Sequence, residues 1–150
     1  MVRGGPDPAQ LRQFMAQLRP GAVVRLYQPV AEKVKRHVLI SAAADRTVAF
    51  IINTQPSPFI IAREEFKRRQ VLMLKADHSF MDHNSYIACH DTVRLQAAPE
   101  LARLVWAGDA QILGTLHESL YEAITEAADK SPLIADRDMQ LIVAGFSRIP

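Results

Sequence analysis

The central part of the chain, about residues 22–95, alternates short apolar segments with turn signals, and this pattern constrains the fold most. Five segments rich in Val, Ile, Leu and aromatic residues predict strands: 22–27, 37–41, 47–52, 71–74 and 86–95. Turn-forming residues separate them, as in Ala44-Asp45-Arg46 and His83-Asn84-Ser85. Short strands with no helix between most of them pair antiparallel, so we predict a small, strongly curved, barrel-like sheet. Residues 60–69 are ambiguous and fit one or two turns of surface helix.

Helices are predicted on both sides of this region. Asp7-Pro8 combines a good N-cap with proline at the first helical position, and Pro20-Gly21 ends that helix. Near the other end, Thr115 to Glu118 fits a capping box, and Ser131-Pro132 repeats the cap-then-proline signal. Gly145 is a suitable terminator for the last helix. Pro99 to Trp106 fits a further short helix.

These segments together predict one α+β domain over residues 1–150. Its barrel-like sheet covers about residues 20–96, and its C-terminal helical part covers about residues 98–147. A length of 150 residues with 49% hydrophobic residues is enough for one sizeable core.

Composition also bears on location and partners. No run approaches the roughly eighteen apolar residues of a membrane span, and residues 1–6 lack the apolar core of a secretory signal. Cys89 is the only cysteine, as expected in a reducing compartment, so we predict a cytoplasmic protein without membrane association. Residues 1–94 carry fourteen Lys/Arg and eight Asp/Glu, whereas residues 95–150 carry four and eight. Either the basic part binds an anionic partner, or the uneven distribution of charge along the chain has no function.

Five segments in order resemble the PemK/MazF family of bacterial toxin ribonucleases. LRPGAVV (18–24) is similar to the family's "GDIV" strand, KRHVLIS (35–41) to "RPAVVLS", and INTQPSPF (52–59) to "TTQ…PF". YIACHDTVRL (86–95) is similar to "ALADQVRSI", and residues 114–128 resemble the closing glycine-plus-helix segment. HSFMDHNSYI (78–87) also resembles a pattern of uncharacterised PemK-like proteins.

The resemblance implies an SH3-like barrel, a homodimer with an RNA groove near its interface, and neutralisation by an antitoxin protein. It implies a metal-independent endoribonuclease for single-stranded RNA, with Arg36 and Thr54 as the catalytic pair. Two departures favour an alternative, a catalytically inactive PemK-like module that binds nucleic acid or protein: His37 replaces the family's proline, and Gln28 to Val34 contains no glycine. The last helix also extends beyond the family's usual end.

The chemistry of metal-free RNA cleavage suits these residue types. The 2′-hydroxyl must lose a proton, the charge on phosphorus must be held, and the leaving 5′-oxygen must gain a proton. Arg36 has a planar fork of donors that matches a phosphate, and arginine stays protonated, so we assign it to charge stabilisation. Thr54 can orient the phosphate or the attacking hydroxyl; either residue can instead be an ordinary strand-edge or turn residue.

Six further residues are candidates for substrate contacts: Lys35, His37, Gln55, His78, His83 and Ser85. His37 is adjacent to Arg36, and successive side chains on a strand point to opposite faces. It is therefore expected away from a groove that Arg36 faces, unless a bulge intervenes. Basic residues near aromatics are typical of a single-stranded RNA groove, and the chain has two such clusters, 33–36 and 67–69.

A metal site is the third interpretation of the histidines. His78, His83, Cys89 and His90 lie within thirteen residues, but their spacing matches no common zinc pattern. Cys89 lies in an apolar strand, where a small buried side chain is its ordinary role. We therefore predict neither a metal nor another cofactor.

Overall fold

The computed structural model describes residues 5–147, so residues 1–4 and 148–150 of the predicted domain lie outside the described part. Seven strands form one sheet: β1 (Ala22–Gln28), β2 (Lys33–Ala42), β3 (Thr47–Asn53), β4 (Gln70–Met73), β5 (Ser85–Ala88), β6 (Val93–Leu95) and β7 (Ala110–Thr115). Six α-helices accompany it: α1 (Pro8–Gln17), α2 (Pro58–Ile61), α3 (Glu64–Lys67), α4 (Ala98–Ala107), α5 (Tyr121–Ala128) and α6 (Asp136–Phe146). Two 3-10 helices are η1 (Lys75–Asp77) and η2 (Glu118–Leu120).

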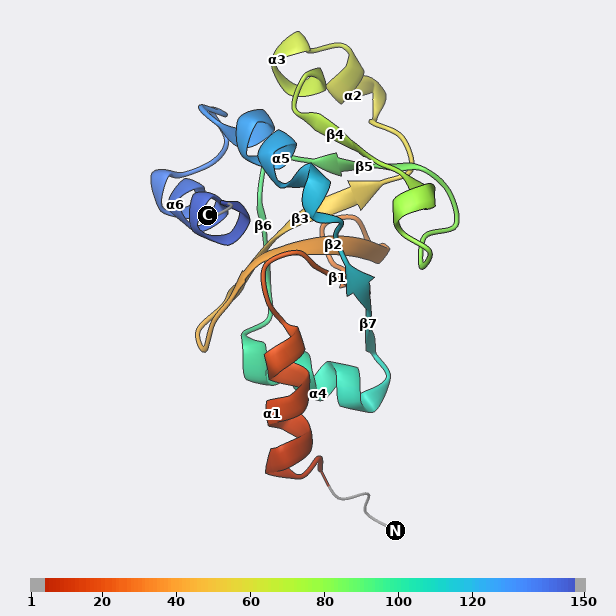
Figure 1. Cartoon of the computed structure of the whole chain (residues 1–150), viewed down its shortest axis with the longest axis vertical. Coiled ribbons are helices and arrows are strands. Elements are labelled where there is room, and N and C mark those ends of the chain that lie inside the picture. The colour runs from red at the N-terminus through yellow and green to blue at the C-terminus, as the bar shows by residue number, and fades with distance from the viewer. Residues whose placement is uncertain (1–4, 148–150) are drawn as a thin grey trace.

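The sheet has the order β4-β5-β3-β2-β1-β7, with β6 paired to the far end of β3, and every pair of strands is antiparallel (Figure 1). The predicted α+β class with an antiparallel sheet is confirmed. The two end strands, β4 and β7, do not pair with each other among the described residues, so the sheet is open and not closed into a barrel. Register shifts in β1 at Val23/Val24 and in β2 at Leu39/Ser41 bend the strands where they occur.

Helices cover both faces of this sheet. One hydrophobic core joins Val38, Phe50 and Ile87 to Ile124 of α5 and Ile142 of α6. The other core joins Val24, Leu39 and Ala49 on the opposite face to Leu101 of α4, with Phe14 and Met15 of α1 packed beside it. Figure 1 shows α1 and α4 together on one side and α5 and α6 on the other. Because both faces are buried, the central strands are almost continuously apolar, as the sequence shows.

The first helix follows its sequence signals closely. The carboxylate of Asp7 accepts hydrogen bonds from the backbone N–H groups of Ala9 and Gln10, and the side chain of Gln10 accepts from the N–H of Asp7. This reciprocal arrangement satisfies donors that the first helical turn leaves free. The helix ends at Gln17, just before Pro20, as predicted.

Three predictions of elements were wrong in detail. The predicted strand 86–95 is two strands, because a turn at Cys89-His90 redirects the chain from β5 to β6. Thr115 is not a helix cap: it ends β7, where it pairs with Ala22, and α5 begins only at Tyr121. Ser131 is not a cap either, since its hydroxyl donates to the carbonyl oxygen of His90.

At two glycines, another group of the protein lies so close that a side chain would not fit. β7 carries Gly114 because a Cβ at this position would meet the ring of Phe80 at 2.5 Å. Gly145 lies inside α6 and does not end it, since a Cβ there would come within 3.0 Å of the Ile40 carbonyl oxygen. Gly114 lets the Phe80 ring pack closely on β7, and Gly145 lets α6 pack closely on β2.

The helices of the described residues are short or polar enough that none of them meets the length and hydropathy needed to cross a bilayer.

Candidate functional site

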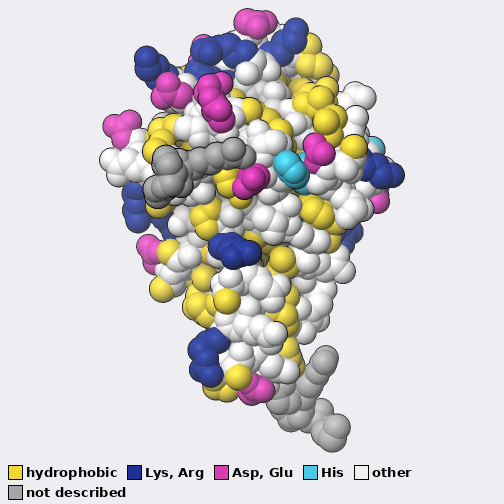
Figure 2. All heavy atoms as spheres, in the orientation of Figure 1, with side chains coloured by type: hydrophobic (Ala, Val, Ile, Leu, Met, Phe, Trp, Pro, Cys, Tyr) yellow, Lys and Arg dark blue, Asp and Glu magenta, His cyan; other side chains and the backbone are white. Residues whose placement is uncertain are grey.

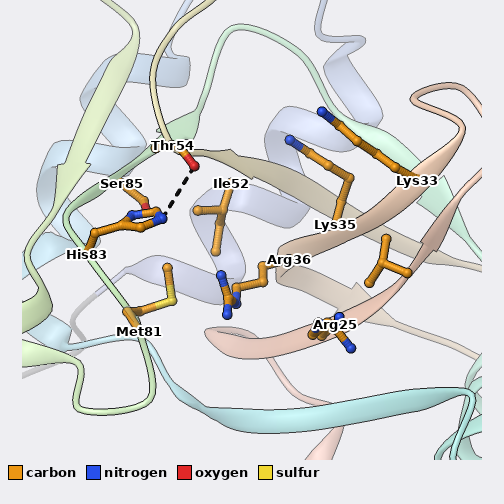
Figure 3. Close-up of a pocket in the computed structure, with 10 residues that line it drawn as sticks. Arg25, Lys33, Lys35, Arg36, Ile52, Thr54, Met81, His83 and Ser85 are labelled. Atoms are coloured by element: carbon orange, nitrogen blue, oxygen red, sulfur yellow. Dashed lines mark hydrogen bonds between the residues drawn. The ribbon is translucent and has the colours of Figure 1, made fainter.

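A hollow of about 290 Å³ lies where β1, β2 and β3 meet the loop before β5 (Figure 3). Four cationic side chains, two hydroxyls, one imidazole and three apolar side chains line it: Arg25, Lys33, Lys35, Arg36, Thr54, Ser85, His83, Val34, Ile52 and Met81. None of these lining residues is acidic. The hollow is therefore suited to an anion.

Two arginines lie directly opposite each other at this site. Arg25 of β1 and Arg36 of β2 are partners in the antiparallel register, and their side chains share one face of the sheet. Like charges at such a position destabilise a sheet unless an anion lies between them. Within residues 5–147, the single acid that contacts either guanidinium is Asp82, whose Oδ2 accepts from the Arg36 Nη2 at 3.1 Å.

Arg36 keeps unused donor capacity. Its Nε atom is buried and has no hydrogen-bond partner, while Asp82 on the loop is 77% exposed. A surface ion pair of this kind is weak, on the order of 0–1 kcal/mol. An incoming phosphate can therefore compete with Asp82 for the terminal nitrogens of Arg36.

The other side of the hollow carries a chain of hydrogen-bonding groups. The Nδ1–H of His83 donates to the carbonyl oxygen of Asn84 at 2.9 Å, with the Ser85 Oγ 3.1 Å from the same nitrogen. Because a carbonyl can only accept, the neutral ring carries its proton on Nδ1, and Nε2 is left as an acceptor. The Thr54 hydroxyl faces that Nε2 at 3.5 Å (Figure 3). This geometry suits proton acceptance by His83, and catalytic contacts of this length commonly shorten when substrate binds.

The structure brings four predicted site residues together: Arg36, Thr54, His83 and Ser85. Lys35 also lines the hollow, but Figure 3 shows its amino group, like that of Lys33, directed away from Arg36. Its Nζ donates to the Asn53 Oδ1 at 2.6 Å, and burial together with the charge of Lys33 lowers the pKa of Lys35. Gln55 is exposed and is not among the lining residues.

His37 is buried, so the prediction that it contacts substrate was wrong. Its side chain is fully enclosed on the opposite face from Arg36, as strand alternation requires. The Val30 N–H donates to the Gln28 Oε1, which leaves the Gln28 amide to donate to the His37 Nε2 at 3.3 Å. Burial lowers the pKa of His37 to about 4, and the charge of Lys35 acts in the same direction.

His78 is buried as well, so it does not line the groove as predicted. Its Nδ1–H donates to the carbonyl oxygen of Leu74 at 2.7 Å, and its Nε2 accepts from the backbone N–H of His117 at 2.9 Å. Both ring nitrogens are thereby used to join the loop after β4 to the segment before α5. This histidine is structural.

The second basic cluster, 67–69, does not form a phosphate groove. Arg69 is 1% exposed, and its guanidinium donates to protein acceptors on α3 and at the C-terminal end of α5. The remaining charges are mixed, because Glu64 and Glu65 lie in the same short helix, α3. Figure 2 shows cationic and acidic side chains side by side at the end of the molecule where α2 and α3 lie.

Sequence reasoning missed Arg25 and Asp82. Arg25 is a lone charge in the apolar segment AVVRLYQ, and that interruption was the available signal. Asp82 lies within the HSFMDHNSYI segment, but its pairing to Arg36 depends on a loop 46 residues away in the chain. Among the described residues, no group of three or more His, Cys, Asp or Glu side chains is close enough to hold a metal ion. Cys89 is buried, and this burial raises the pKa of its thiol.

No protein-family model matches the chain, and no curated protein is similar enough to count as a relative.

Proposed function

We propose that this protein is a metal-independent endoribonuclease that cleaves single-stranded RNA in the hollow between Arg36 and His83. The observation that supports this most directly is the Arg25–Arg36 cross-strand pair, which shares one hollow with a histidine whose Nε2 is an acceptor facing the Thr54 hydroxyl. A phosphodiester supplies the anion that the pair lacks. The adjoining ribose supplies the hydroxyl that the imidazole can deprotonate.

Each residue has a chemical role in this reaction. The His83 Nε2 accepts the proton of the 2′-hydroxyl, and the 2′-oxygen then bonds to phosphorus while Arg36 and Arg25 hold the added negative charge. The bond between phosphorus and the 5′-oxygen breaks, and the imidazolium returns its proton to that oxygen. The products are a 2′,3′-cyclic phosphate and a 5′-hydroxyl. Thr54 orients the attacking hydroxyl, and Ser85 and the Asn84 carbonyl hold the imidazole in the required tautomer.

The resemblance to PemK/MazF toxins extends this proposal. The curved antiparallel sheet would be an open relative of their SH3-like barrel, and the protein would act as a cytoplasmic homodimer restrained by an antitoxin. The order of the resembling segments supports this extension, since each of KRHVLIS and INTQPSPF contributes two residues to the same hollow.

A binding module without catalysis is the second candidate. The Arg36–Asp82 ion pair favours it, because the carboxylate occupies one edge of the guanidinium that a phosphate would use. In that case the hollow would bind RNA, with an affinity that decreases as salt increases, and would leave it intact.

Cleavage in the presence of EDTA separates the two candidates. We expect the purified chain to cut a mixed-sequence RNA in EDTA and to leave 2′,3′-cyclic phosphate ends. His83→Gln should lower the cleavage rate by about 100-fold or more, as expected for loss of a general base. The matched control is His117→Gln, an exposed histidine that does not line the hollow. Salt-dependent binding of RNA by wild-type protein that never cuts it would support the binding module instead.

A further inference from the structure

A second hollow, of about 490 Å³, lies on the other side of β2 from Arg36. It is formed by the β1–β2 loop, the ends of β2 and β3, and the turn between β5 and β6. Lys33 and Lys35 line both hollows. An RNA strand, with one phosphate per nucleotide, can therefore pass from the first hollow to the second along the ammonium groups of Lys33 and Lys35.

Asn53 presents a hydrogen-bond donor to this second hollow. Its Oδ1 accepts from the Lys35 Nζ at 2.6 Å, and an ammonium group can only donate. The orientation of the amide is thereby determined, with the oxygen toward Lys35. The two hydrogens of the Nδ2 group have no protein acceptor among the described residues and remain for a ligand.

His90 presents a second donor. The Gln70 Nε2 donates both to the Phe66 carbonyl oxygen and to the His90 Nδ1, each at 3.0 Å. Since Nδ1 accepts, the neutral ring carries its hydrogen on Nε2. Burial lowers the pKa of His90, which keeps the ring neutral at pH 7. The His90 ring packs against the Phe66 ring with centroids 5.3 Å apart, and this contact stabilises the position of the imidazole.

The other lining residues supply apolar surface and one hydrogen-bond acceptor. Ile51, Ala88 and Val93 supply apolar surface, and Asp91 supplies the acidic group of this lining. One Asp91 oxygen accepts from the Thr92 N–H at 2.8 Å, which leaves the other oxygen of this exposed carboxylate for a ligand. Apolar surface with a small number of placed polar groups is typical of a small-molecule site, and here the polar groups are Asn53, His90, Asp91 and the two lysines.

We propose that this second hollow is a nucleobase subsite that takes guanine from the RNA strand, a proposal that rests on the function proposed above. The N–H groups of Asn53 and His90 would donate to O6 and N7, and the free Asp91 oxygen would accept from N1–H. Guanine alone among the four bases has two adjacent acceptors at O6 and N7 with donors next to them. Adenine has an amino group in place of O6, and this group would face the two donors. The pyrimidines lack N7.

Nucleotide titration tests the subsite apart from catalysis. The full chain would be titrated by calorimetry with the 5′-monophosphates of guanosine, adenosine, cytidine and uridine at one fixed salt concentration. We expect guanosine monophosphate to bind about tenfold more tightly than the others, the preference that one bidentate contact typically provides. Equal binding of all four nucleotides would overturn the proposal.

Two variants address the donors separately. Asn53→Asp replaces the amide N–H groups with an oxygen, and His90→Phe keeps a ring against Phe66 without its N–H. Each should remove most of the tenfold preference. Gln140→Glu makes the same charge change as Asn53→Asp on an exposed face of α6 and should retain it. A preference that survives both Asn53→Asp and His90→Phe would place guanine elsewhere and overturn the assignment.

Sequencing of cleaved RNA ends distinguishes this proposal from the proposed function. Cleavage with no guanine preference beside the cut would contradict the subsite and leave the nuclease standing. Guanosine monophosphate binding that depends on Asn53, in a protein that cuts no RNA, would support the subsite and contradict the nuclease.

Discussion

Two arginines, Arg69 and Arg36, occupy opposite circumstances in this molecule. Arg69 at the start of β4 is enclosed, and its Nε and both terminal nitrogens bind protein oxygens. It donates to the carbonyl oxygens of Ala127 in the last turn of α5 and of Asp129 just after α5, at 2.8 and 2.6 Å, and to the Glu65 carboxylate at 2.6 Å. This residue fastens α3, β4 and α5 to one another.

Arg36 is the reverse case. It faces another arginine, binds one exposed carboxylate, and has a buried Nε without a partner. The carboxylate that Arg36 binds is exposed and weakly held, so an anionic ligand can take its place. The difference indicates that Arg69 contributes to stability and Arg36 contributes to binding. The following changes test that division.

Arg69→Ala should have the largest effect, and the effect should be on stability. Two main-chain carbonyls lose their donor, at about 1–3 kcal/mol each, and a large buried side chain leaves a cavity. We expect the free energy of unfolding in urea to fall by about 3–5 kcal/mol. The adjacent exposed residue provides the control, since Arg68→Ala should change it by less than about 1 kcal/mol. Equal effects of the two changes would contradict the structural role of Arg69.

Arg36→Ala should lower kcat/KM on RNA by about 100- to 1,000-fold, the usual consequence of removing one donor to a developing oxyanion. Its free energy of unfolding should stay within about 1 kcal/mol of wild type, because only a surface ion pair is lost. Arg36→Lys keeps the charge without the fork and should recover little activity. A large loss of stability in Arg36→Ala would show that Arg36, like Arg69, contributes to stability, and would contradict the division proposed here.

His37 extends the comparison to the other face of β2. The pKa of His37 is about 4 in the folded protein, below the ordinary value of 6.5, because burial favours the neutral ring. Below pH 6.5 His37 becomes protonated in the unfolded chain but stays neutral in the folded chain. The free energy of unfolding therefore falls as the pH decreases to about 4. The loss amounts to about 3 kcal/mol in all.

Urea unfolding at several pH values measures this loss. His37→Gln should have a flatter dependence than wild type between pH 6.5 and 4, because the variant cannot titrate there. Parallel curves for the two proteins would show that His37 is not buried in its neutral form.

Asp82→Asn should have the smallest effect. It removes the one carboxylate that competes with phosphate for Arg36, and an exposed ion pair contributes about 0.2–1 kcal/mol. We expect RNA affinity, measured by fluorescence anisotropy at fixed salt, to increase by less than about fivefold, with stability unchanged. A marked decrease in affinity would mean that Asp82 contacts the substrate directly.

Local signals in the chain predicted the elements that depend on local physics. Asp7 and Pro8 define the start of α1, and the apolar segments of β1 and β3 appear within one residue of the predicted ends. β7 was missed, because a strand with Gly114 and few apolar residues is stabilised by its partner β1 and by the ring of Phe80. Short strands and short connections predicted a barrel-like sheet, and whether such a sheet closes depends on whether its end strands meet.

By itself, the sequence determined the α+β class, the antiparallel pairing and the placement of Arg36 and His37 on opposite faces of one strand. These follow from residue spacing and from the alternation of side chains along a strand. Only the tertiary structure decided which charges are satisfied. Arg36 and Arg69 look alike in the chain, and the difference between them comes from acceptors 58 and 60 residues away for one and a single exposed carboxylate for the other. Hydrogen-bond partners at such separations depend on how elements pack, and no local pattern encodes them.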